Sequence, residues 1–340
     1  MMMHEFEALR RVLRDYSGAE LKENTIAIVD AKLAPVLKAY QLLSIGDLTA
    51  ALMQPGNDCL RQRVAEAVAV NESYFFRNRE CFSYVSDVLL PRLMERRAHA
   101  RRIRIWCAAC STGQEPYSVA MLLADMGATL NGWTIEILAT DFSQAALQKA
   151  REGLYTQFEV QRGLPATKLI KYFEKSDAAW RIDPDIRRRV GFREHNLLED
   201  CAGFGRFDVI LCRNVLIYFD AALRAAVLKR LAGQLETDGY LILGAAETTT
   251  GHSRDFVRVE DSRSGVFRLD PGAAHTGEGQ GFLAEGGEPM AQFRSVKLDR
   301  ATVDSLEAKA RARGLTLASL LAEFAGTGPH AGPSNGLKRG

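Results

Sequence analysis

The sequence has few cysteines, almost no net charge and no long apolar segment. Its six cysteines are too few for a disulfide scaffold and indicate a reducing compartment. Lys and Arg number 44 against 42 Asp and Glu, so the composition gives no reason to expect a nucleic-acid-binding protein. No apolar run approaches the roughly 18 residues of a membrane-spanning helix, and residues 1–11 lack the apolar core of a secretory signal. We therefore expect a cytoplasmic protein without membrane insertion.

The 340 residues suggest about two domains, and the first is predicted to be a small all-α domain over residues 1–80. Apolar side chains recur there at helical spacing, as in Phe6, Leu9 and Leu13. Residues 81–102 are dense in arginine and are predicted to be a linker. The alternative for these arginines is a docking patch for an acidic partner.

From residue 103 to residue 270, β-rich runs alternate with helical patterns. The predicted strands are 103–107, 134–141, 191–195, 207–212 and 240–244, followed by an antiparallel pair over 256–260 and 266–269. Such alternation is typical of an α/β fold with a parallel sheet built from βαβ units. The segment 155–190 interrupts the alternation and is predicted to be an insertion.

The remaining residues divide into three predicted segments. Residues 271–290 are Gly-rich and typical of a linker, and residues 327–340 are predicted to be a disordered tail. Residues 291–326 show a strand–helix–helix pattern, which is similar to a ribbon-helix-helix unit. With six Lys and Arg against four Asp and Glu, this segment has little surplus charge for binding phosphates. We expect it to mediate self-association or partner docking.

The loop after the first predicted strand, residues 107–116, consists mainly of small residues and includes Gly113. Ligands of open α/β sheets bind beyond the carboxyl ends of the strands, and small residues allow a cofactor to approach the backbone. Glu115 could therefore contact a cofactor, or it could form a capping box with Thr112. The G-x-G-x-x-G fingerprint of dinucleotide-binding proteins is absent, which argues against NAD.

Two further features of these strand ends have alternative interpretations. Cys107 and Cys110 form a lone C-x-x-C pair without a second pair or a nearby histidine, so we expect no metal and interpret them as small apolar residues. Asp141 ends the second strand, where an acidic residue often holds a nucleotide ribose. The alternative is that Asp141 caps the following helix.

Several longer motifs give a specific resemblance. They are NESYFFR at 71–77, WCAACSTGQEPYSVAM at 106–121, ATDFS at 139–143, HNLL at 195–198 and CRNVLIYFD at 212–220. In this order and spacing they resemble the chemotaxis receptor methyltransferases of the CheR type, over about residues 5–270. The resemblance implies a class I (Rossmann-like) methyltransferase domain with an antiparallel last strand and a small β insert. It also implies methyl transfer from S-adenosylmethionine to glutamate side chains of chemoreceptors (methyl-accepting chemotaxis proteins) in adaptation signalling.

The resemblance assigns roles to individual positions. The cofactor-binding residues that it implies are Asn71, Ser73, Arg77, Gly113, Glu115, Asp141, Asn196, Leu197, Arg213 and Asn214. Glu115 and its loop would hold the methionine end, Asp141 the ribose, and Asn196 and Leu197 the adenine. Arg77 and Tyr218 would face the acceptor carboxylate and the methyl group, as the catalytic residues.

The sequence departs from the family in two places. The stretch that usually carries a basic receptor-docking face has only Lys32 and Lys38, with Pro35 between them. The segment from Glu174 to Arg181 lacks the glycines of members that bind a receptor's C-terminal pentapeptide, so we expect no such tether. Two alternatives remain open, a methyltransferase with another acceptor and a non-catalytic adaptor. The presence of both Arg77 and Tyr218 favours an enzyme.

Overall fold

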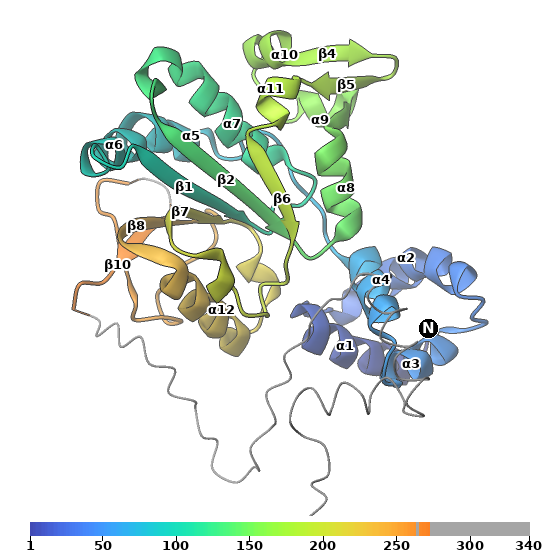
Figure 1. The fold of residues 1–340 in the computed structure, drawn as a ribbon. Coiled ribbons are helices and arrows are strands. Elements are labelled where there is room, and N and C mark those ends of the chain that lie inside the picture. Colours follow the sequence, from blue (N-terminus) through green and yellow to red (C-terminus); the bar gives the residue numbers. More distant parts are fainter. Residues whose placement is uncertain (263–264, 273–340) are drawn as a thin grey trace, which may run out of the picture. The chain divides into compact units, whose positions relative to one another are not determined.

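The computed structural model describes residues 1–262 and 265–272, which form N-terminal helices, a seven-stranded sheet with flanking helices and a small three-stranded sheet (Figure 1). Most of the predicted linker 271–290 lies outside these residues, and so do the predicted segments 291–326 and 327–340. No helix of the described residues is long and apolar enough to span a membrane.

The bounds of the elements are as follows. The helices are α1 (Met3–Ser17), α2 (Ile26–Ala39), α3 (Ile45–Met53), α4 (Asp58–Val68), α5 (Arg79–Tyr84), α6 (Leu90–Arg96), α7 (Gln114–Met126), α8 (Gln144–Glu152), α9 (Gln157–Gln161), α10 (Ala166–Tyr172), α11 (Pro184–Arg187) and α12 (Ala221–Gln234). The strands are β1 (Arg102–Ala108), β2 (Thr134–Asp141), β3 (Leu154–Thr156), β4 (Phe173–Ser176), β5 (Ala179–Ile182), β6 (Val190–Glu194), β7 (Phe207–Cys212), β8 (Leu235–Leu243), β9 (Phe256–Arg258) and β10 (Val266–Leu269).

The large sheet has the strand order β6-β2-β1-β7-β8-β10-β9. Strands β6, β2, β1, β7 and β8 run parallel, and β10 pairs antiparallel with both β8 and β9. The predicted α/β fold with an antiparallel end is therefore confirmed. Because β1 lies between β2 and β7, the loops that follow these three strands open at the same edge of the sheet.

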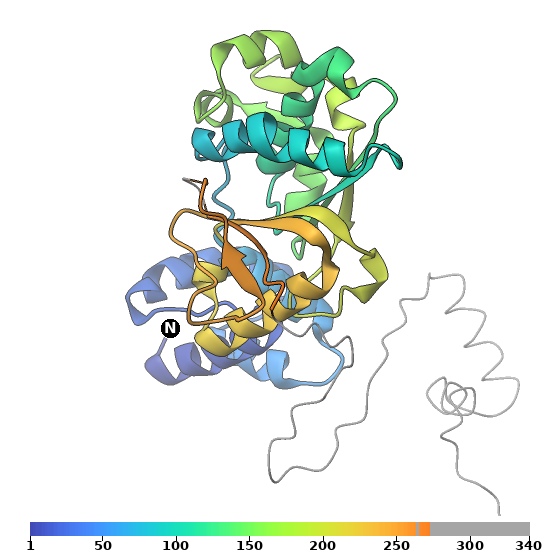
Figure 2. The same cartoon turned by 90° about the vertical axis from the view of Figure 1, so that its left-hand side faces the viewer.

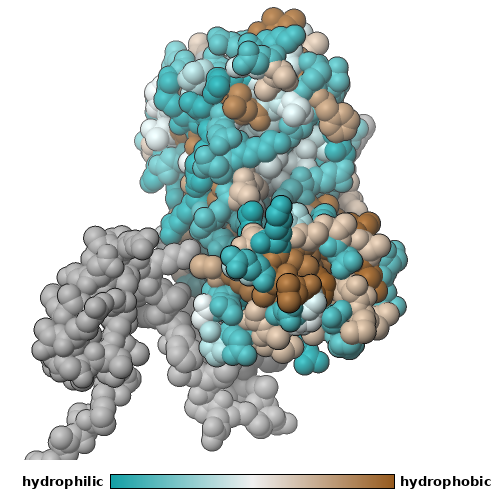
Figure 3. All heavy atoms as spheres, turned by 90° about the vertical axis from the view of Figure 1, so that its right-hand side faces the viewer, coloured by the Kyte–Doolittle hydropathy of each residue, from teal (hydrophilic) through white to brown (hydrophobic). Residues whose placement is uncertain are grey.

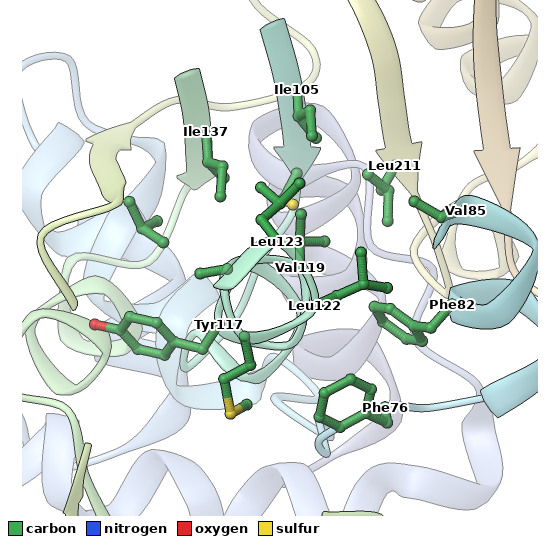
Figure 4. Close-up of a cluster of buried hydrophobic side chains, with 14 of the residues drawn as sticks. Phe76, Phe82, Val85, Ile105, Tyr117, Val119, Leu122, Leu123, Ile137 and Leu211 are labelled. Carbon is green, nitrogen blue, oxygen red and sulfur yellow. The ribbon is translucent and has the colours of Figure 1, made fainter. Parts of the chain in front are cut away.

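Both faces of the sheet are buried, and alternate residues of each strand serve opposite faces. In β1, Ile105 and Cys107 belong to the cluster that contains the α7 residues, whereas Trp106 packs with Leu228 of α12 on the other face. Figure 4 shows the first cluster, in which side chains of α7 lie between the strands and the phenyl ring of Phe82. This two-sided burial explains why the strands read as continuous apolar runs.

The prediction that residues 81–102 form a linker is wrong, because most of them are helical. Helices α5 and α6, joined by a π-helical turn over Val85–Leu89, pack against the sheet, and Leu90 and Leu93 are fully buried. Four arginines of this stretch form ion pairs within the molecule, as when Arg97 Nε donates to Asp208 at 2.8 Å. The dense arginines obscured the apolar spacing of these short helices.

The N-terminal helices α1 to α4 have a hydrophobic core of their own, which includes Leu13, Leu33 and Leu48. Helix α1 ends at Gly18, which has φ 73°. A Cβ at Gly18 would lie 2.8 Å from the ring of Phe219, so glycine allows α1 to approach the loop after β7.

The insertion forms a three-stranded antiparallel sheet of order β3-β5-β4 with α9, α10 and α11 around it. It lies beyond β6, away from the N-terminal helices, in both Figure 1 and Figure 2. Gly163 of the insertion has φ 86°, and a Cβ there would lie 2.0 Å from the carbonyl oxygen of Phe75. Close packing of the insertion on the segment 71–77 therefore requires glycine at this position.

Strand β8 begins earlier than expected. The dipeptide Asp238-Gly239, which precedes the predicted strand 240–244, lies inside β8, and the pairing of β7 with β8 shifts register between Phe207 and Val209. Between these two paired positions β8 has three more residues than β7, and the Asp238-Gly239 dipeptide lies in this irregular part of the strand.

Candidate active site

A cavity of about 570 Å³ lies between the N-terminal helices and the carboxyl ends of β1, β2 and β7. Its volume is within the range of small-molecule and cofactor pockets, roughly 300–1,000 Å³. The predicted site residues that line it are Asn71, Ser73, Arg77, Glu115, Asp141, Asn196, Leu197, Arg213, Asn214 and Tyr218. Predicted site residues from the segment 71–77 and from the loop after β7 thus share one cavity.

Gly113 is the predicted site residue that does not line this cavity. It precedes α7 with φ 91°, and a Cβ there would lie 2.9 Å from the Cβ of Ala150 and 3.2 Å from the hydroxyl of Tyr155. Its lack of a side chain therefore allows the loop to pack against the protein interior, on the side of α8.

The loop after β1 has an unusual backbone. Ala109 (φ 58°) and Ser111 (φ 50°) both adopt left-handed conformations, which non-glycine residues rarely do. The amide of Ser111 donates to the Asp141 carboxylate at 2.8 Å, and the amide of Cys110 donates to the carbonyl of Thr140 at 2.8 Å. These bonds hold the loop of β1 against the end of β2. Strained conformations of this kind concentrate at functional sites.

Glu115 forms an ion pair with Arg213, and the capping-box interpretation with Thr112 is wrong. The Arg213 Nη1 to Glu115 Oε2 distance is 3.0 Å, while Gly113 occupies the N-cap of α7 without a side-chain cap. Arg213 Nη2 also donates to the carbonyl of Arg77 at 2.6 Å. Burial raises the pKa of Glu115, and the charge of Arg213 opposes this rise. The pair thus joins α7, the loop after β7 and the segment 71–77 at one point.

Asp141 accepts two backbone hydrogen bonds at the end of β2, from Ser111 N at 2.8 Å and Ser143 N at 2.9 Å. It does not cap α8, because Ser143 does so by accepting from Ala146 N at 3.1 Å. Burial raises the pKa of Asp141, and these amides act in the opposite direction. Each carboxylate oxygen uses one lone pair for an amide, which leaves acceptor capacity that a hydroxyl group can use.

Asn196 and Leu197 follow β6 and form the wall beside α1. Asn196 Nδ2 donates to the carbonyl of Tyr16 at 2.7 Å, and its Oδ1 accepts from Leu198 N at 3.1 Å. The side-chain amide of Asn196 therefore links α1 to the loop that follows β6. Leu197 is nearly buried and gives this part of the wall an apolar surface.

Arg77 and Tyr218 also line the cavity. The Arg77 guanidinium is 5.0 Å from the centroid of the Tyr74 ring, and Nη1 donates to the carbonyl of Glu72 at 3.4 Å. Burial, followed by the charge of Glu72, raises the pKa of Tyr218, so its hydroxyl remains protonated at neutral pH. These two side chains offer the cavity one cation and one neutral hydroxyl donor.

Sequence reasoning missed two charged residues next to this site. Lys32 of α2 lines the cavity, and its Nζ donates to the carbonyls of Val68 (3.3 Å) and Ala69 (3.0 Å). Glu247 follows β8 and accepts from Asn214 N at 2.7 Å. An acidic residue just beyond a strand's carboxyl end was a usable signal for Glu247, as it was for Asp141.

The described residues contain no group of three or more His, Cys, Asp or Glu side chains placed to hold a metal ion. Cys107 and Cys110 are buried in the main core, and burial raises the pKa of both thiols well above the usual value. Their packing agrees with the interpretation of small apolar residues at a strand end.

We expect the free energy of unfolding to depend on pH through the buried side chain of His195. It is 7% exposed, its ring centroid is 4.7 Å from that of Phe204, and burial lowers its pKa to about 4 from 6.5. Between these values the unfolded chain binds a proton that the folded chain does not, so the free energy of unfolding decreases as the pH falls. We expect His195 to account for about 1.5 kcal/mol of the loss between pH 6.5 and 5. Urea unfolding of the wild type and of His195→Phe across this range measures it, and parallel pH profiles would contradict the assignment.

Comparison with known proteins assigns the chain to a family. A profile of the family described as CheR methyltransferase, SAM binding domain, matches residues 71–265. Chemotaxis protein methyltransferase Cher2 of Pseudomonas putida is 34% identical over 270 residues, which cover 78% of this chain and 97% of that protein. Chemotaxis protein methyltransferase 1 of Pseudomonas aeruginosa is 36% identical over 268 residues, with 78% and 97% covered. Its counterpart in Vibrio cholerae is 35% identical over 268 residues, with 78% and 96% covered. The chain, with its helical N-terminal part and its cavity at the ends of β1, β2 and β7, therefore belongs to the CheR family of S-adenosylmethionine-dependent methyltransferases.

Proposed function

We propose that this protein transfers the methyl group of S-adenosylmethionine to glutamate side chains of chemoreceptors and so forms methyl esters. The observation that carries the proposal is the single cavity that contains both the carboxylates Glu115 and Asp141 and the donors Arg77 and Tyr218. The relatives named above are chemotaxis protein methyltransferases, which supports this acceptor. We place the activity in the cytoplasm, where the helical cytoplasmic domains of such receptors lie.

The residues of the cavity fit the cofactor part by part. Asp141 has free acceptor capacity for ribose hydroxyls, and the small residues before Glu115 leave room for the methionine end beside the backbone. Leu197 offers an apolar wall for adenine, as the resemblance implies. Asn196 donates to Tyr16, so we assign it to the position of α1 and to the adenine wall together. Asn71, Ser73, Arg213 and Asn214 would complete the pocket.

The chemistry requires positioning more than proton transfer. When bound, the sulfonium cofactor supplies an electrophilic methyl group. A glutamate acceptor has an ordinary pKa near 4.3, so at neutral pH it is already the nucleophilic carboxylate. The task of the protein is to align that carboxylate in a site with little water. The Arg77 guanidinium can bind one carboxylate oxygen, and the neutral Tyr218 hydroxyl can orient it without holding the ground state too tightly.

A methyl-transfer assay tests the proposed function. The full chain is incubated with S-adenosylmethionine carrying a tritiated methyl group and with cytoplasmic domains of candidate receptors. Label that enters the receptor and is released as methanol by base is the expected result, because esters are base-labile. Label that is stable to base would indicate another type of acceptor. Cofactor binding without transfer to any receptor would favour the non-catalytic adaptor.

The assignment of Asp141 predicts a large effect on cofactor affinity. Asp141→Ala should weaken the binding of S-adenosylhomocysteine by about 1–3 kcal/mol, because polar groups in the pocket lose their acceptor. Asp141→Asn, which keeps one carbonyl oxygen, should lose less. Titration calorimetry measures both variants, and binding by the wild type should be unaffected by EDTA. An unchanged affinity of Asp141→Ala would refute the ribose assignment.

The surface of the N-terminal helices differs from a basic docking face. The ammonium group of Lys32 donates hydrogen bonds to the carbonyls of Val68 and Ala69 at the end of α4. Lys38 is the exposed lysine of α2. Figure 3 shows hydrophobic side chains gathered at the height of the N-terminal helices. Among the residues of these helices and their loops, Leu43 is 96% and Met53 57% exposed. We infer that contact with a receptor here depends on apolar packing more than on charge.

The hairpin of the insertion leads us to expect weak binding of a receptor's C-terminal peptide. Strands β4 and β5 are joined by the tight turn Asp177-Ala178, and the whole hairpin from Glu174 to Arg181 contains no glycine. Close pairing with an added peptide strand is helped by glycine, which is absent from this hairpin. We therefore expect no tight binding of a receptor C-terminal pentapeptide. A micromolar dissociation constant in calorimetry would overturn this expectation.

A further inference from the structure

Glu247 joins the end of β8 to the loop that follows β7. Its Oε2 atom accepts from the backbone amides of Asn214 and Gly244, both at 2.7 Å, and its Oε1 atom accepts from the amide of Ile217 at 3.3 Å. The side chain is 9% exposed and does not line the cavity. One buried carboxylate therefore takes three backbone amides from two separate segments.

The loop that Glu247 holds has a backbone that needs support. Asn214 adopts a left-handed conformation with φ 61°, which costs free energy for a residue with a side chain. A Cβ at Gly244 would lie 2.6 Å from Asn214 Nδ2 and 2.6 Å from Glu247 Oε2, so the contact between the two segments leaves no spare room. The same loop presents Asn214 and Tyr218 to the cavity.

We propose that Glu247 is a positioning residue for methyl transfer. Its carboxylate fixes the backbone of residues 214–217, and through that backbone it sets the direction in which Asn214 and Tyr218 enter the cavity. Glu247 itself does not line the cavity, so it acts through the loop rather than on the bound groups. The inference rests on the proposed function, because Tyr218 has a role only where a methyl group is transferred.

Three variants separate positioning from general stability. Glu247→Ala removes all three acceptor contacts. Glu247→Gln places a carbonyl oxygen at the Oε2 position and keeps both 2.7 Å contacts, at the expense of the longer contact to Ile217. Asp208→Ala is the matched control. Asp208 is a buried carboxylate that also accepts a backbone amide, from Arg104 at 2.8 Å, but it lies at the opposite end of β7 from the cavity.

The expected results differ between these variants. In Glu247→Ala, kcat should fall about 100-fold, as is typical of a misplaced catalytic group, at a temperature where circular dichroism shows a folded protein. The KM for the acceptor should change less than kcat. Glu247→Gln should stay within about threefold of wild-type kcat, since it loses one long hydrogen bond. Asp208→Ala should lower the melting temperature and leave the kcat of the folded protein unchanged.

Hydrogen exchange gives a readout that does not depend on activity. The peptide amides of residues 214–217 should exchange faster in Glu247→Ala than in the wild type and in Asp208→Ala. The inference is overturned if Glu247→Ala keeps wild-type kcat, if Glu247→Gln is as slow as Glu247→Ala, or if exchange at this loop is unchanged. A wild-type protein that transfers no methyl group would refute the proposed function instead, and the exchange experiment would still decide whether Glu247 holds the loop.

Discussion

Glu115→Ala should lower the free energy of unfolding by about 3 kcal/mol and abolish measurable binding of S-adenosylhomocysteine. The Arg213 side chain is 2% exposed, and Glu115 is its carboxylate partner at 3.0 Å. Without Glu115 the guanidinium remains buried over the Phe82 ring, with the carbonyl of Arg77 as its hydrogen-bond acceptor, and its Nε atom has no partner among the described residues. An uncompensated buried charge is far more costly than the loss of a surface ion pair.

Urea unfolding and titration calorimetry measure these two effects. Glu136→Ala is the control for stability, because Glu136 pairs with Arg102 at a site where its side chain is 43% exposed, and its loss should cost less than about 1 kcal/mol. The double variant Glu115→Ala with Arg213→Met should recover stability, since both charges are removed together. It should not recover cofactor binding. Equal stability of Glu115→Ala and Glu136→Ala would refute the importance of the buried pair.

Arg77→Ala and Tyr218→Phe should lower the rate of methyl transfer while they retain cofactor binding. We expect about a 100-fold loss of kcat for Arg77→Ala, because the acceptor carboxylate loses the group that aligns it. The backbone of Arg77 should stay in place, since Arg213 holds its carbonyl at 2.6 Å. Tyr218→Phe removes the hydroxyl and keeps the ring, so it tests the hydroxyl as a donor.

Single-turnover methylation and calorimetry with S-adenosylhomocysteine separate rate from affinity in these variants. Arg79→Ala is the matched control, since Arg79 is exposed at the start of α5 and does not line the cavity. Its rate should equal that of the wild type. A full rate in Arg77→Ala or Tyr218→Phe would show that the assigned role is wrong for that residue.

The local sequence was sufficient to predict the strands of the large sheet. The carboxyl-terminal halves of β1 (residues 105–108) and β7 (residues 209–212) are entirely apolar, and such a run bounded by a small-residue loop is a local signal. The motifs at 71–77, 106–121 and 212–220 likewise point to one site, and each of them includes residues that line the cavity. Local periodicity failed at α5 and α6, where arginines interrupt a short apolar face whose burial depends on the sheet.

The sequence by itself determined the fold class, the family resemblance and most of the candidate residues that share the cavity, because strand patterns and motif composition are properties of neighbouring residues. The tertiary structure alone decided what those residues contact. Glu115 pairs with Arg213, 98 positions away, and Glu247 holds Asn214, 33 positions away. Both contacts exist because β7 lies between β1 and β8 in the sheet, an order that hydrogen bonds between strands create and that no local pattern encodes.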